Sequence, residues 1–139
     1  MKKYIFGGLF ILLGLLTAIG PQLLFAVCPV HGDQVMKCFW TARAEIGAGA
    51  VTAISGLLII LIRSAGTRLG IYFSLILNGT LSLLIPTILI GVDDDPMMSC
   101  HTYTLPVLVV ASAAVIAAAL AGVLYTIHSG YKGRKQYET

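Results

Sequence analysis

The sequence predicts an all-α integral membrane protein, a single domain over residues 1–139 that folds as an up-and-down bundle of four helices with both termini inside. Three observations predict this fold. Of the 139 residues, 58% are hydrophobic and only 11% are charged, whereas a soluble domain carries about 25% charged residues. Four stretches reach the roughly 20 apolar residues that a membrane span needs. Basic residues collect on one side of these stretches.

The four expected spans cover about residues 4–27, 41–62, 69–90 and 103–127. The first, third and fourth contain no Asp, Glu, Lys or Arg, and the second contains only Arg43 and Glu45, both near its start. A cleaved signal peptide is the competing interpretation of the first span. Its apolar run is longer than the 7–15 residues of a signal-peptide core, and Phe25-Ala26-Val27 is a poor small-residue cleavage site, so we favour a retained helix.

The basic residues predict the orientation of the spans. They precede the first span, flank the turn between the second and third, and follow the fourth: Lys2, Lys3, Arg63, Arg68, Lys132, Arg134 and Lys135. The opposite loops, residues 28–40 and 91–102, hold Lys37 and four aspartates. Positive residues stay inside, so we expect cytoplasmic termini in the cell membrane of a prokaryote. No basic face is interleaved with aromatics, which gives no support for nucleic-acid binding.

The two outer loops are rich in soft ligand atoms. The candidate metal ligands are Cys28, His31, Cys38, Cys100 and His101, and Met36, Met97 and Met98 are possible extra ligands. Thiolates and thioethers favour copper(I), and thiolate with imidazole favours zinc or copper; a haem-type cofactor is a further option. The spacing contains no Cys-x-x-Cys pair. A structural disulfide explains the cysteines equally simply, because thiols outside the cytoplasm usually oxidise.

The second span carries one small and polar face. Glu45, Gly49, Thr52 and Gly56 recur at helical spacing. Arg43 lies two residues from Glu45 and therefore on nearly the opposite side of the helix. Ionisable residues at membrane depth are costly and often functional, so we expect Glu45 to face the interior. For Arg43 we expect an outer-loop aspartate, a lipid phosphate or another protein as its partner.

The segment between the first two spans resembles a known family. Cys28-Pro29-Val30-His31-Gly32, followed by Met36-Lys37-Cys38-Phe39-Trp40-Thr41-Ala42-Arg43-Ala44-Glu45-Ile46-Gly47, is similar to the signature of a prokaryotic family of small four-helix membrane proteins classed as a domain of unknown function. The resemblance implies an accessory role beside an ABC-type permease in export or uptake, and it brings no established activity.

Three functions fit these observations, and we favour a non-enzymatic one. The first is an accessory membrane subunit whose outer face binds a soft metal ion or metallocofactor, serving a larger transport complex. The second is a thiol-disulfide oxidoreductase, for which the missing Cys-x-x-Cys pair is a serious departure. The third is a purely structural permease partner stapled by a disulfide. The sequence contains no catalytic nucleophile–base constellation, and besides the lipid bilayer we expect a permease or a second copy as partner.

Overall fold

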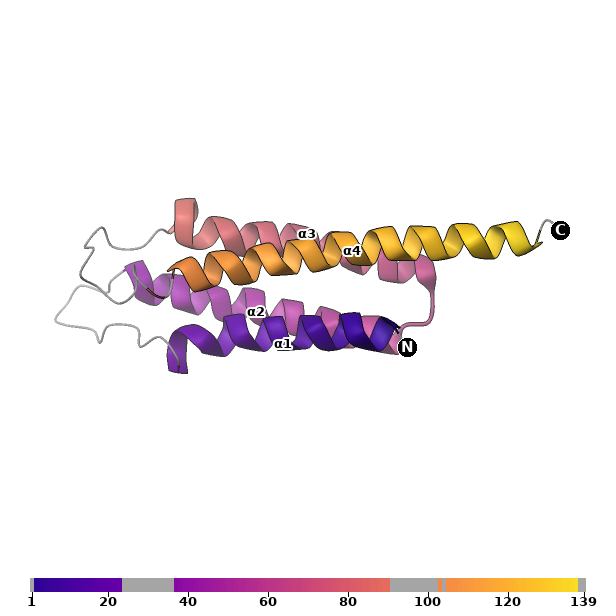
Figure 1. The fold of residues 1–139 in the computed structure, drawn as a ribbon. Helices are drawn as coiled ribbons and strands as arrows, with labels where there is room; N and C mark the ends of the chain where they lie inside the picture. Colours follow the sequence, from indigo (N-terminus) through magenta and orange to yellow (C-terminus); the bar gives the residue numbers. More distant parts are fainter. Residues whose placement is uncertain (1, 24–36, 91–102, 104, 138–139) are drawn as a thin grey trace.

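The computed structural model describes residues 2–23, 37–90, 103 and 105–137, and within them every regular element is helical. The chain forms α1 (Lys2–Leu23), α2 (Lys37–Leu61), α3 (Ala65–Leu84) with a π-helical continuation η1 (Ile85–Leu89), and α4 (Leu105–Tyr137). The helices lie side by side, and each runs opposite to its neighbour in the sequence (Figure 1). The start of α1, the turn between α2 and α3 and the end of α4 therefore share one end.

Three of these helices are long and apolar enough to cross a membrane: Phe39–Leu61, Ala65–Leu89 and Leu105–Gly130. The apolar part of α1 that the structure describes, Tyr4–Gly20, is shorter; residues 24–27 of the expected first span lie outside the described residues. The exposed large side chains of the helices are mainly aliphatic, for example Leu12, Leu77 and Leu124, each about 70% exposed. Such a surface suits lipid, so this is a membrane protein.

The helices extend beyond the apolar runs at some ends. α2 begins at Lys37, before the expected start at 41, and α4 continues to Tyr137, past the expected end at 127. Lys, Arg and Gln are good helix formers, so a helix does not stop where its hydrophobicity stops. α4 consequently projects past the other three helices at the end where α1 starts (Figure 1).

Glycine allows the closest packing between α1 and α2. A Cβ built on Gly14 would lie 2.5 Å from the backbone nitrogen of Ala53, and one built on Gly56 would lie 2.7 Å from the carbonyl oxygen of Gly7. Small residues let helix backbones approach, and helix association in lipid depends on such packing. α3 and α4 form the second closely packed pair, and contacts between the two pairs are fewer.

The apolar core lies toward the end where α1 starts. It is built from Phe10, Ile59, Tyr72, Leu75, Val115, Ala119 and Val123. Near the other end, α3 changes to a π-turn in which the Ile90 N–H donates to the Ile85 carbonyl at 3.0 Å. Pro86, at the start of this turn, has no N–H to continue the α-helical pattern. Such π-turns occur at the C-terminal ends of helices.

Candidate functional site

The interior of the protein holds one buried carboxyl group among the described residues, on Glu45 of α2. Its side chain is 0% exposed. It lies six residues after Phe39, where the apolar segment of α2 begins, which is about 9 Å along the helix axis at 1.5 Å per residue. Glu45 therefore faces inward at membrane depth, the orientation that its helical spacing with Gly49 and Thr52 predicts.

Serine hydroxyls from two other helices approach this carboxyl group. The Ser82 hydroxyl of α3 donates to Glu45 Oε2 at 2.6 Å. Ser112 Oγ of α4 lies 3.2 Å from Ser82 Oγ and 2.8 Å from the Leu108 carbonyl oxygen, so its single proton is available to either acceptor. Both serines are buried. The Glu45, Ser82 and Ser112 side chains thus join α2, α3 and α4 through one chain of oxygen atoms, the carboxyl–hydroxyl cluster.

The second carboxyl oxygen, Glu45 Oε1, is buried without a hydrogen-bond partner among the described residues. Glu45 also forms no ion pair within that part of the chain. An unpaired buried polar atom costs free energy, and an unpaired buried charge costs far more. The cluster is therefore chemically incomplete on the Oε1 side.

A second polar contact joins α2 to α3 one turn deeper. The Asn78 amide donates to the Ala48 carbonyl and to the Thr52 hydroxyl, both at 2.9 Å, and the Thr52 hydroxyl donates to the same carbonyl at 2.9 Å. The amide and hydroxyl groups of this contact are hydrogen-bonded to each other and to the Ala48 carbonyl. The contact therefore stabilises the packing of α2 on α3, as polar contacts between helices in lipid do.

The polar face predicted for α2 is divided between two neighbours. Gly49 and Gly56 pack against the α1 backbone, whereas Glu45 and Thr52 bond to side chains of α3. Sequence reasoning did not identify Ser82 and Ser112 as members of the site. The available signal was the spacing of Asn78 and Ser82, four residues apart on one face of an otherwise apolar span.

Comparison with known proteins gives a family for this chain. A family model described as "Domain of unknown function (DUF4418)" matches residues 10–125. The chain belongs to the DUF4418 family. No curated protein and no solved structure matches it. The matched region contains the whole carboxyl–hydroxyl cluster and both predicted outer loops, and the name of the family carries no activity.

Arg43 of this DUF4418 protein lies on the outside of α2. Its side chain is exposed, and its guanidinium carbon lies 5.1 Å from the centroid of the Phe39 ring, one turn away on the same helix. A cation over an aromatic face is a favourable contact. The Asp93–Asp95 run, one of the partners expected for Arg43, lies outside the described residues.

The outer-loop ligands proposed for the DUF4418 chain are also outside the described part. Cys28, His31, Cys100 and His101, with Met36, Met97 and Met98, fall in residues 24–36 and 91–102, and Cys38 lies in the first turn of α2 with its side chain not described. Among the residues that the structure describes, no group of three His, Cys, Asp or Glu side chains forms a metal site. Metal binding by these residues stays a prediction.

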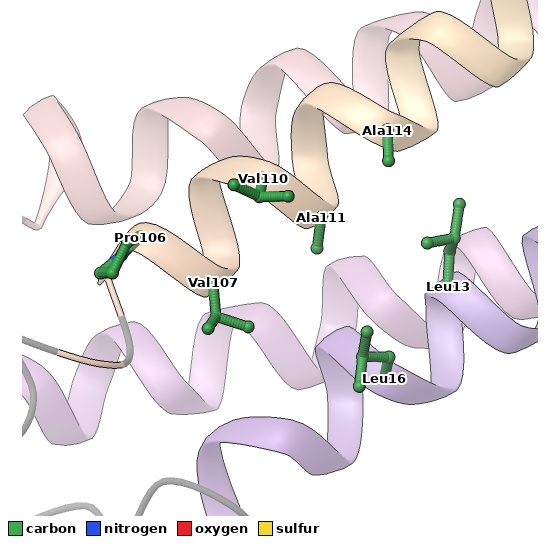
Figure 2. Close-up of a pocket in the computed structure, with 7 residues that line it drawn as sticks. All are labelled: Leu13, Leu16, Pro106, Val107, Val110, Ala111 and Ala114. Atoms are coloured by element: carbon green, nitrogen blue, oxygen red, sulfur yellow. The ribbon is translucent and has the colours of Figure 1, made fainter.

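An apolar groove of about 320 Å³ lies between α1 and α4. Leu13 and Leu16 of α1 face Val107, Ala111 and Ala114 of α4 across it, and Pro106 borders it at the start of α4 (Figure 2). Its lining consists of aliphatic side chains and proline, so the groove offers no group for acid–base chemistry or for a metal. The carboxyl–hydroxyl cluster, by contrast, contains the buried carboxyl group of the described interior.

Proposed function

We propose that this DUF4418 protein is a non-enzymatic accessory subunit of the prokaryotic cell membrane that binds a soft metal ion or metallocofactor on its outer face. In this proposal α1 is a fourth span, the four helices form an up-and-down bundle, and the termini are cytoplasmic. Cys28, His31, Cys38, Cys100 and His101 are the ligands, with copper or zinc as the ion. A larger transport complex, such as an ABC-type permease, is the partner.

One observation supports bringing these ligands together. α1 and η1 end, and α2 and α4 begin, at the same end of the helices (Figure 1). The chain segments with Cys28 and His31 and with Cys100 and His101 are bordered by these four helix ends, and Cys38 lies in the first turn of α2. These helix ends support the proposal that the five candidate ligands belong to one site.

The orientation has independent support from charge. Lys2 lies at the start of α1 and Arg63 in the α2–α3 turn, both at the end opposite to Cys38, and the α4 extension at that end includes Lys132, Arg134 and Lys135. Positive residues are retained on the cytoplasmic side. This arrangement favours an extracytoplasmic position for the cysteine-bearing end.

Elemental analysis of the purified protein tests the proposal. The protein is prepared under reducing conditions, loaded with zinc or copper(I), and freed of excess metal before the bound metal and free thiols are counted. We expect bound metal in the wild type, and loss of it in Cys38→Ser and His31→Ala. His128→Ala is the matched control, since His128 is exposed on α4 toward the opposite end, and it should retain the metal.

Two outcomes would contradict the proposal. Wild-type protein without affinity for zinc or copper(I), together with one disulfide inert to reductant, would favour the purely structural role of the cysteines. Equal metal content in wild type, Cys38→Ser and His31→Ala would mean that the metal is bound elsewhere. Co-purification in mild detergent then identifies the partner complex separately from the metal.

A further inference from the structure

We propose that the carboxyl–hydroxyl cluster of Glu45, Ser82 and Ser112 is an intramembrane binding site for one monovalent cation, either a proton or an alkali ion. Glu45 comes seven residues after Cys38, which is about 10 Å further along α2. The proposal therefore does not depend on metal binding by the cysteines.

The incomplete coordination of Glu45 is the first argument. Oε2 accepts from Ser82, but Oε1 is buried with no hydrogen-bond partner among the described residues. The native structures of proteins rarely leave such atoms unpaired without a functional reason or a bound ion or water. A proton or a cation at Oε1 would complete the carboxyl group.

Charge is the second argument. No described basic side chain faces Glu45, because Arg43 is exposed on the other side of α2 over Phe39. A carboxylate inside a membrane needs a positive partner or a proton. A single positive charge would leave the site neutral, which favours a monovalent ion over a divalent one.

No other described titratable group near the cluster supplies that charge. From the helices packed against Glu45, the groups that face it are the serine hydroxyls of α3 and α4. Thr17 of α1 packs on Gly49 and donates to carbonyls of its own helix. The remaining charged or titratable side chains lie toward the other end or on the exposed surface: Lys2, Tyr4, Arg63, Arg68, Tyr72, Tyr103, Tyr125 and His128.

The chemistry of the remaining ligands is the third argument. Ser82 Oγ, Ser112 Oγ and the Leu108 carbonyl oxygen continue from Glu45 Oε2 in steps of 2.6, 3.2 and 2.8 Å. Hard cations take oxygen ligands of these kinds, and hydroxyl groups also pass protons by exchanging donor and acceptor roles.

Labelling of Glu45 by a carbodiimide, which reacts with protonated carboxyl groups, tests the proposal on the full chain in detergent. Modification is followed by mass spectrometry while pH and Na⁺ are varied. We expect Glu45 to be modified, and the modification to fall as its proton is lost or displaced. Suppression by Na⁺ at constant pH identifies an alkali ion; insensitivity to Na⁺ with suppression at high pH identifies a proton.

The thermal unfolding midpoint provides a second readout with variants. The wild-type midpoint should change with pH or Na⁺, and that of Glu45→Gln should change less, because the remaining histidines and carboxylates still titrate. If the cation is an alkali ion, Ser82→Ala should weaken the response to it by about tenfold in concentration, because a ligand oxygen is lost. If it is a proton, Ser82→Ala should instead move the response to higher pH, because the hydroxyl that donates to the carboxylate is lost. Ser74→Ala is the matched control, since Ser74 is an exposed serine of the same helix, and it should behave as wild type.

If wild type and Glu45→Gln respond identically to pH and Na⁺, the site does not bind a cation and the proposal is overturned. If Glu45→Gln does not fold, labelling of the wild type decides alone, and absence of any pH or Na⁺ effect on that labelling overturns the proposal. Metal content at the outer face is measured on the same samples. Failure of one proposal is thereby distinguished from failure of the other.

Discussion

Gly14 of α1 and Gly49 of α2 meet backbone to backbone, and neither position has room for a side chain. A Cβ on Gly14 would lie 2.6 Å from the Gly49 carbonyl oxygen, and a Cβ on Gly49 would lie 2.6 Å from the Gly14 carbonyl oxygen. Gly7, seven residues before Gly14, and Gly56, seven residues after Gly49, repeat this relationship. The α1–α2 interface thus depends on glycines that recur every seven residues.

Gly49→Ala is expected to lower the free energy of unfolding by about 1–3 kcal/mol, the usual cost of overpacking a close contact. The reason is that the new methyl group meets backbone atoms of α1, which cannot rotate away. Denaturant unfolding in detergent micelles, followed by circular dichroism, measures the change. Gly47→Ala is the control on the same helix, because a Cβ at Gly47 would have nothing within 4 Å. Equal stability of the two variants would contradict the proposed role of the glycines.

Gly122→Ala is expected to disturb the α3–α4 interface through Tyr72. A Cβ on Gly122 would lie 2.4 Å from Cε1 of the Tyr72 ring, and this ring is only 2% exposed and packs on Phe6 and Phe10. Because the ring is confined, Gly122→Ala should destabilise the protein by about 1–3 kcal/mol.

Shortening the tyrosine should relieve part of that clash. We therefore expect Gly122→Ala with Tyr72→Leu to be less destabilised than the sum of the single changes, a coupling that a double-mutant cycle of unfolding free energies measures. Gly130→Ala serves as the control on α4, since a Cβ there meets nothing within 4 Å. Strict additivity of the two changes would mean that the clash does not exist.

Asn78→Leu is expected to weaken the contact between α2 and α3. The variant loses two side-chain hydrogen bonds, to Ala48 and Thr52, and interhelical bonds in membranes contribute about 0.6 kcal/mol each on average, with a maximum of about 1.7. We expect a loss of about 1–2 kcal/mol in detergent unfolding. Thr80→Ala, whose exposed hydroxyl bonds only within α3, should change stability little; a larger effect of Thr80→Ala would contradict the assignment.

Thiol labelling in whole cells tests the orientation. After reduction, a membrane-impermeant reagent should label Cys28, Cys38 or Cys100 in intact cells. Ser129→Cys, introduced into a chain without the three native cysteines, should be labelled only after the cells are broken, because Ser129 is exposed on α4 toward the end where α1 starts. The reverse pattern would require an inverted orientation and would remove the basis for an extracytoplasmic metal site.

Much of the fold follows from hydropathy, because long apolar stretches in lipid must be helical to satisfy their own backbone hydrogen bonds. The opposite placement of Arg43 and Glu45 follows from a separation of two residues on a helix, and the structure exposes the first and buries the second. The division of the α2 face between two helices could not be predicted, because periodicity identifies an inward face without identifying the helices that cover it.

The members of the carboxyl–hydroxyl cluster on α3 and α4 also could not be predicted from the sequence. Glu45 was predicted to face the interior because a carboxyl group is costly in the membrane. Apart from the spacing between Asn78 and Ser82, nothing in the sequence separated Ser82 and Ser112 from other residues of apolar spans, because only the packing of three helices brings them together. Serine is tolerated in membrane helices because its hydroxyl bonds back to its own backbone, as Ser112 does to Leu108. Composition alone therefore could not separate a site residue from a packing residue.

The separation of the helices into two closely packed pairs has a consequence for biogenesis. α1 and α2 contain both halves of their glycine interface within the first 61 residues, so this hairpin has all of its own contacts available while the ribosome is still synthesising α3 and α4. The later hairpin then joins it through the shared apolar core, in which Phe10 and Ile59 meet Tyr72, and through the hydrogen bonds of Asn78 and Ser82. Membrane insertion of this chain is accordingly expected to proceed by hairpins, with Glu45 enclosed only when the second hairpin arrives.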